Sequence, residues 1–139
     1  MIEVKELVKS FDGFRALDGL NMNVPKGAVY GLVGPNGAGK STAIRHMAGI
    51  YRQDSGEVLI DGEPVYENPE LKGRIAYIPD EIFYFTQARI KDMAVFYSGV
   101  YPRFSMERFE KLGTAFGLDA NRTMRKLSKG MQNQAAFWL

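Results

Sequence analysis

A glycine-rich stretch followed by a lysine and two hydroxyl residues lies at residues 34–42, with the sequence Gly-Pro-Asn-Gly-Ala-Gly-Lys-Ser-Thr. This spacing matches the pattern Gly-x-x-x-x-Gly-Lys-Ser/Thr at every fixed position. Glycines let successive backbone N–H groups turn inward around a phosphate, and Lys40 would place a positive charge beside the terminal phosphates. Ser41 would offer its hydroxyl to Mg²⁺, an ion that takes few protein ligands. The residues predicted to bind nucleotide here are Gly34, Asn36, Gly37, Ala38, Gly39, Lys40, Ser41 and Thr42.

The elements on either side of this stretch would hold it in place. Residues 28–33 form a short apolar run, which predicts a buried strand. Residues 42–48 predict the first helix, which Gly49 would end. The phosphates would then lie at a helix N-terminus, where unpaired N–H groups and the helix dipole both favour anions. This order of elements favours a phosphate site over an accidental glycine-rich turn.

A second candidate site follows much later, at residues 127–132, with the sequence Leu-Ser-Lys-Gly-Met-Gln. Ser128 and Gly130 would open a helix and bind an anion through backbone N–H groups and one hydroxyl. An ordinary serine N-cap explains the same residues when they are taken alone. Their position beyond a phosphate loop, after a helical segment, gives the site its weight.

The first half of the chain alternates apolar and polar residues as strands do. The predicted strands are residues 2–8, 20–24, 56–60 and 74–78. Asp61 and Gly62 form a strong turn pair after the third of them. This half therefore reads as strands around one helix.

Helical spacing replaces strand alternation after Pro79. Apolar residues recur at this spacing over residues 90–101. Ser105 is predicted to cap the next helix, with Phe104 and Phe109 packing across its start and a glycine at position 117 as its end. The last helix would open at Ser128 and place Met131, Ala135 and Trp138 on one face.

Composition limits the function classes. Hydrophobic residues make up 45% and charged residues 24% of the 139, as in an ordinary globular domain. The net charge of +2 is too small to indicate a nucleic-acid partner, and the absence of cysteine excludes disulfides and thiolate chemistry. No apolar run approaches the ~20 residues of a membrane helix. The sequence ends on Phe137, Trp138 and Leu139 without a closing helix signal, so we expect these side chains to be exposed and the chain to be the N-terminal part of a longer protein.

With both motifs in view, the whole chain resembles the nucleotide-binding domain of ABC transporters. Residues 55–62 are similar to the strand and turn that follow that family's phosphate-loop helix. Residues 75–79 resemble the approach to its Q-loop, and residues 127–131 resemble its signature, Leu-Ser-Gly-Gly-Gln. The resemblance implies an α/β fold of the P-loop NTPase class, ABC type. Residues 1–79 would hold an incomplete core, with the phosphate-loop strand and helix, and an antiparallel β-subdomain. Residues 80–139 would hold the helical subdomain and the signature helix.

The resemblance also assigns roles to single residues. Phe11 lies where the family places an aromatic residue that stacks on adenine, with Phe14 as a rival. Asp80 stands where the family has a glutamine; its carboxylate would reach Mg²⁺ directly or through water, or it would cap the next helix. Lys129 replaces the first glycine of the signature, and it would either contact a partner's terminal phosphate or point into solvent.

The implied function is ATP binding, with Mg²⁺, in the ATPase subunit that energises a transporter. ATP would lie between two copies arranged head to tail, and a transmembrane permease subunit would hold them at the cytoplasmic face of the membrane. The family's Mg²⁺-binding Asp, its catalytic Glu and its switch His have no counterpart here, because the sequence ends at Leu139. The one histidine, His46, lies on the phosphate-loop helix, where we predict a surface or helix-face position. We therefore expect ATP binding without efficient hydrolysis, no catalytic residue, and self-association of the isolated chain.

Other function classes share the phosphate loop. An ABC ATPase of translation or repair would look similar over this length. A GTPase would need Asn-Lys-x-Asp, which does not occur. A small kinase would not explain residues 127–130, and a fragment that only binds nucleotide or acts as a scaffold is the fourth reading.

Overall fold

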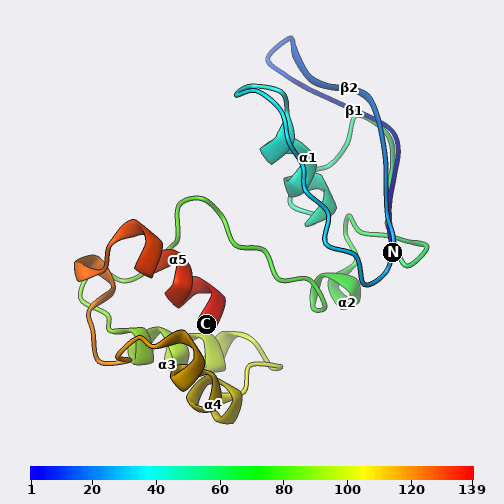
Figure 1. The fold of residues 1–139 in the computed structure, drawn as a ribbon. Helices are drawn as coiled ribbons and strands as arrows, with labels where there is room; N and C mark the ends of the chain where they lie inside the picture. The colour runs from blue at the N-terminus through cyan, green and yellow to red at the C-terminus, as the bar shows by residue number, and fades with distance from the viewer. The chain divides into compact units, whose positions relative to one another are not determined.

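The computed structural model describes all 139 residues and divides the chain into two compact units, Met1–Tyr77 and Ile78–Leu139 (Figure 1). The first unit combines a sheet with short helices, and the second is helical. This matches the predicted change of texture after Pro79.

An antiparallel sheet forms the frame of the first unit. Its strands are β1 (Ile2–Phe11), β2 (Phe14–Val24), β3 (Ser55–Ile60) and β4 (Glu63–Pro64), in the order β2-β1-β3-β4. In the centre, Val4 pairs with Met22 on one side and with Val58 on the other. Asp61 and Gly62 make the predicted turn between β3 and β4, both with positive φ, as a two-residue hairpin of this hand requires.

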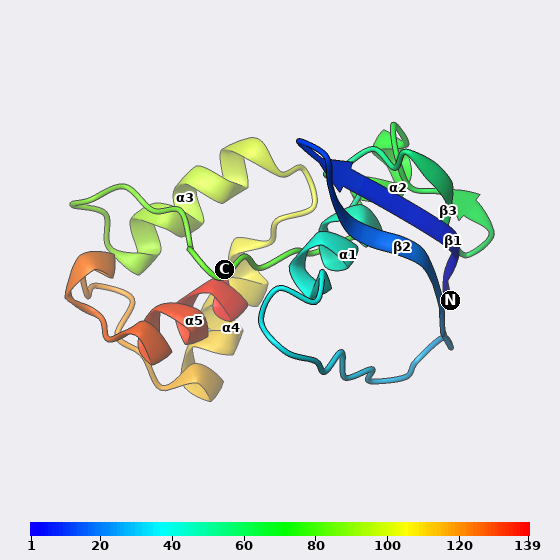
Figure 2. The same cartoon turned by 90° about the horizontal axis from the view of Figure 1, so that it is seen from above.

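Helix α1 (Lys40–Met47) lies against one face of this sheet (Figure 2), and α2 (Pro69–Lys72) is a single turn capped by Asn68. The buried apolar side chains between sheet and helices hold the unit together, because burying each contributes about 1.5–3 kcal/mol. They are Val4, Leu7, Leu17, Ala43, Val58, Val65 and Leu71.

Two of the predicted strands do not form. Residues 28–33 are irregular, with Val29 fully exposed and Val33 93% exposed, and residues 74–78 are irregular as well. Strands β1 to β4 pair only with one another, so neither segment has a neighbour to supply its backbone hydrogen bonds. An apolar run predicts a strand only where a second strand is present to pair with it.

Three helices and a short 3₁₀ turn build the second unit. They are α3 (Ile90–Val100), α4 (Met106–Phe116), the 3₁₀ helix η1 (Met124–Lys126) and α5 (Lys129–Trp138). The predicted signals are confirmed at α4, where the Ser105 hydroxyl accepts from the Arg108 N–H at 3.2 Å and Gly117 ends the helix at φ 62°. The Phe104 and Phe109 rings pack across its start, with centroids 6.4 Å apart.

An aromatic stack closes the core of this unit. The Trp138 ring lies parallel to Phe109, with centroids 4.5 Å apart, and its indole N–H donates to the Phe109 carbonyl at 2.7 Å. Trp138 is therefore buried, and the expectation that it is exposed was wrong; only Phe137 of the last three residues is largely exposed. The packing partner comes from a different helix, which helical periodicity alone does not reveal. Other buried members of this core are Ile90, Met93, Ala94, Met124, Leu127 and Ala135.

The start of α3 is fixed by a charged pair. The Asp92 carboxylate accepts from the backbone N–H of Arg89 at 2.9 Å and from its guanidinium at 2.9 and 3.0 Å. These bonds lower the pKa of Asp92 to about 2. Arg89 thus occupies the N-cap position, so the reading of Asp80 as the cap of the next helix was wrong.

None of the helices has the length and apolar character needed to cross a lipid bilayer.

Candidate functional site

The glycine-rich stretch ends directly at the first turn of α1. Gly39 is the N-cap residue, and the first helical bond runs from the Ala43 N–H to the Gly39 carbonyl at 2.8 Å. The amides of Lys40, Ser41 and Thr42 precede that bond, so they lack the partners that helix geometry gives to later residues. No acidic side chain lies in this turn. The turn therefore offers free N–H groups and the positive end of a helix dipole to an anion.

Gly39 meets the backbone of β2 more closely than any other residue type would allow. Its φ is +81°, and a Cβ added there would lie 2.5 Å from the Ala16 carbonyl oxygen and 2.9 Å from a methyl of Leu17. Both neighbours belong to β2. The second glycine of the motif is thus required by a close approach between the loop and the sheet, in addition to its left-handed conformation.

Lys40 turns back into the loop that precedes it. Its ammonium donates to the Gly34 carbonyl and to the Pro35 carbonyl, at 2.7 Å each. These bonds place the positive charge inside the curve of the loop. A phosphate entering this curve would meet the ammonium already in place.

The remaining predicted loop residues lie around this charge and are open to solvent. Gly34, Asn36, Gly37, Ala38 and Ser41 are exposed, and Thr42 is half-buried. The Ser41 hydroxyl is therefore accessible to a metal ion and its waters. Residues 34–42 thus form one loop and the helix start that follows it, with the Lys40 ammonium bonded to the loop.

His46 is buried, with only 1% of its surface exposed, so of the two predicted positions the surface was wrong and the helix face is right. Its Nδ1 lies 2.8 Å from the Thr42 carbonyl one turn earlier, and its ring meets Tyr51 edge-on at 5.7 Å. It lies three residues after the buried Ala43, on the same face of α1. Its Nε2 has no hydrogen-bond partner. The His46 side chain therefore lies on the buried face of α1, away from solvent.

Phe11 is at the end of β1, with 38% of its surface exposed. Its ring meets Tyr51 edge-on at 5.5 Å, and the Lys9 ammonium lies 5.4 Å from the Phe11 centroid. Phe14, at 66% exposure, pairs with it across the hairpin. The sequence reading missed Tyr51, whose ring connects Phe11 to His46.

An ion pair fixes the end of β1 beside this ring group. The Asp54 carboxylate accepts from the Lys9 ammonium at 2.8 Å and from the Ser10 N–H at 2.7 Å. The lysine is the larger of these influences, and both hold the pKa of Asp54 below its ordinary value. The strand end that carries Phe11 is thereby tied to the chain just before β3.

The second predicted site lies in the helical unit, at the start of α5. The Ser128 hydroxyl accepts from the Met131 N–H at 3.3 Å, as an N-cap does, and Gly130 is exposed. The Lys129 ammonium donates to the backbone carbonyl of Asp80 at 2.6 Å. Lys129 is exposed to solvent while it makes this bond, and the Asp80 carboxylate takes no part in the contact.

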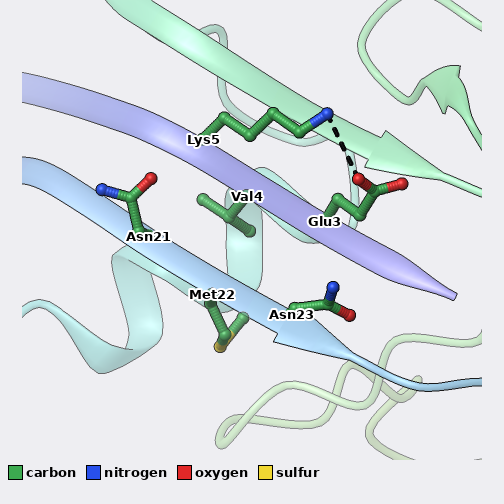
Figure 3. Close-up of a pocket in the computed structure, with 6 residues that line it drawn as sticks. All are labelled: Glu3, Val4, Lys5, Asn21, Met22 and Asn23. Atoms are coloured by element: carbon green, nitrogen blue, oxygen red, sulfur yellow. Dashed lines mark ion pairs between the residues drawn. The ribbon is translucent and has the colours of Figure 1, made fainter.

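A shallow hollow on the sheet involves none of these residues. Figure 3 shows it between β1 and β2, with an ion pair of 3.2 Å between Lys5 and Glu3 at its edge. No group of three or more His, Asp or Glu side chains that would hold a metal ion is present anywhere in the chain. The chemistry-bearing residues are thus those of the two motifs. The hollow is lined by Glu3, Val4, Lys5, Asn21, Met22 and Asn23.

Comparison with known proteins places this geometry in a family. The profile described as "ABC transporter" matches residues 17–138. The chain belongs to the ABC transporter ATP-binding family. The ABC transporter ATP-binding protein YtrB of Bacillus subtilis (strain 168) is 30% identical over 139 residues, which are 100% of this chain and 48% of YtrB. The chain thus spans about half the length of this relative.

Solved structures agree with the family and its fold. An ATP-binding subunit of an ABC transporter is 26% identical, with a TM-score of 0.83 over 99% of this chain and 60% of that one. The protein cbiO1 of Clostridium perfringens, part of the ABC transporter complex cbiONQ, is 25% identical. Its TM-score is 0.77, and the match covers 99% of this chain and 59% of cbiO1. The fold is therefore that of the ATP-binding cassettes of ABC transporters.

The contact between Gly39 and β2 gives a first prediction. Gly39→Ala should destabilise the Met1–Tyr77 unit by about 1–2 kcal/mol or more, because a left-handed φ alone costs an L-residue that much, and the added Cβ would also collide with the Ala16 carbonyl. ATP binding should weaken with it. Urea unfolding and titration calorimetry would measure the two effects. Gly31→Ala is the matched control, since a Cβ there meets nothing within 4 Å; equal stability of the two variants would contradict the argument.

Proposed function

We propose that this chain binds ATP with Mg²⁺ through residues 34–42, as part of the ATPase subunit that energises an ABC transporter. The observation that carries the proposal is the arrangement of Lys40, whose ammonium lies inside a loop that ends at the free first-turn amides of α1. Family membership favours this reading over a phosphate-loop kinase.

Each predicted residue has a role in this proposal. Lys40 neutralises the terminal phosphates, while the amides of residues 37–42 cradle them. Ser41 contributes its hydroxyl to Mg²⁺, which would supply charge neutralisation on the phosphate oxygens. Phe11, which is 38% exposed at the end of β1, stacks on the base. Asp80 would offer its carboxylate to Mg²⁺ directly or through water, as the family resemblance implies.

Two protein partners belong to the proposal. A second copy, arranged head to tail, would present Ser128 and Gly130 to the ATP of the first. A permease subunit would hold the pair at the cytoplasmic face of a membrane, and cbiO1 is itself part of a transporter complex. An exposed row of rings supports a protein partner for the helical unit: Phe85 meets Phe83 at 5.2 Å and Phe96 at 5.0 Å. No nucleic-acid partner is proposed.

Lys40→Ala tests the nucleotide site directly. We expect ATP affinity to fall about tenfold or more, because a hydrogen bond to a charged group contributes roughly 1.5–3 kcal/mol. GTP should lose as much, since the loop contacts phosphates and not the base. Titration calorimetry would compare the wild-type chain, Lys40→Ala and Lys26→Ala, an exposed lysine outside the loop. Equal affinities in all three would place the phosphates elsewhere.

Turnover by this chain alone should be negligible. Phosphoryl transfer needs a positioned metal ion and an oriented water. Lys40 and Ser41 supply phosphate and metal contacts, but the chain has no group of three or more His, Asp or Glu side chains that could hold a metal ion. Release of inorganic phosphate from ATP would measure this. Robust release that disappears in Lys40→Ala would refute the expectation, because contaminating ATPases would survive that substitution.

The chain should also self-associate without nucleotide. Residues 28–33 expose Val29 and Val33 on backbone that pairs with no strand, and such apolar segments recruit other chains. Light scattering in nucleotide-free buffer at micromolar concentration would detect the association. Val29→Lys combined with Val33→Lys should suppress the association, because like charges oppose strand pairing. Phe137→Lys would test whether the exposed phenylalanine at the end of α5 contributes as well. A stable monomer of the wild-type chain would overturn this proposal.

A further inference from the structure

Two side chains at the start of α5 extend to the same irregular segment, Asp80–Tyr84. The Lys129 ammonium donates to the Asp80 carbonyl at 2.6 Å, and the Gln132 amide donates to the Tyr84 hydroxyl at 3.3 Å. Lys129 and Gln132 are three residues apart, so they lie on one face of the helix. The two bonds therefore grip the segment at both of its ends.

The segment has little else to hold its backbone. Residues 80–84 belong to no helix or strand, and none of their backbone groups pairs with another backbone group. Tyr84 packs its ring partly against the core of the unit, while Asp80 and Glu81 are exposed. The lysine bond is thus the contact that fixes the Asp80 end.

The grip is also anchored on the helix side. Gln132 donates to the Met124 carbonyl at 3.3 Å as well as to Tyr84, which ties the same amide to η1. Lys126, the other nearby lysine, is exposed and makes no such bond. The position of Lys129 in the sequence, directly after Ser128, therefore matters more than the general positive charge of this region.

We infer that Lys129 and Gln132 form a clamp, the 80–84 clamp, in which Lys129 is a positioning residue that fixes Asp80 relative to Ser128. The functional consequence rests on the proposed nucleotide site, in which Ser128 contacts ATP. A movement of Ser128 on binding ATP would then displace Asp80 through the Lys129 side chain. The clamp thereby gives a physical role to the lysine that departs from the signature pattern.

Limited proteolysis of the full chain with chymotrypsin tests the clamp. Cleavage after Phe83, Tyr84 and Phe85, identified by mass spectrometry, should be about threefold faster or more in Lys129→Met, because this variant loses the charged hydrogen bond to the Asp80 carbonyl. The gain in rate is modest because that hydrogen bond is exposed to solvent. Lys129→Arg keeps a donor and should restore the wild-type rate. Lys126→Met is the matched control and should leave it unchanged.

The outcomes separate the clamp from general damage and from the proposed function. Trp138 fluorescence during unfolding reports the core of the unit, and it should be the same in all variants. If Lys129→Met unfolds the unit, Gln132→Met replaces it as the probe at the other end. Cleavage at the wild-type rate in both variants would overturn the clamp. If Lys40→Ala bound ATP as tightly as the wild-type chain, the proposed nucleotide site would be wrong, but the cleavage result and the clamp would stand.

Discussion

The contact between the phosphate loop and the backbone of β2 is the constraint on which the candidate site depends. Only a glycine at position 39 allows α1 to begin beside the Ala16 carbonyl, and that starting point sets the direction of the helix. From there Ala43 and His46 face the inside of the unit, while the first-turn amides face solvent. The hairpin of β1 and β2 thus determines where the loop would hold a phosphate.

Local signals allowed much of the fold to be predicted from the sequence. The caps at Ser105 and Ser128 and the turn at Asp61 and Gly62 depend on neighbouring residues only, and the structure confirms them. Residues 28–33 were predicted wrongly because strand formation depends on a second segment, which composition does not supply. The burial of Trp138 was missed for a related reason, since its partner belongs to another helix.

The candidate site divides in the same way. Residues 34–42 could be identified because the motif is contiguous, and the structure places them together. The interactions of the two lysines could not be predicted, because they depend on where carbonyl groups lie after folding. Lys40 and Lys129 both donate to backbone carbonyls, at Gly34 and Pro35 in one unit and at Asp80 in the other. In each case a charge near a proposed phosphate contact is already oriented by the main chain.

The stack of Trp138 on Phe109 fixes the C-terminal end of α5 against α4. Ten residues at 1.5 Å each separate that end from the Ser128 cap by about 15 Å. Gly113 touches the indole so closely that a Cβ would lie 2.9 Å from the ring. A change of residue size at position 113 would therefore tilt the helix about its base and move the serine at its tip. A glycine on α4 therefore helps to set the position of Ser128, the residue that the proposed function assigns to a nucleotide contact.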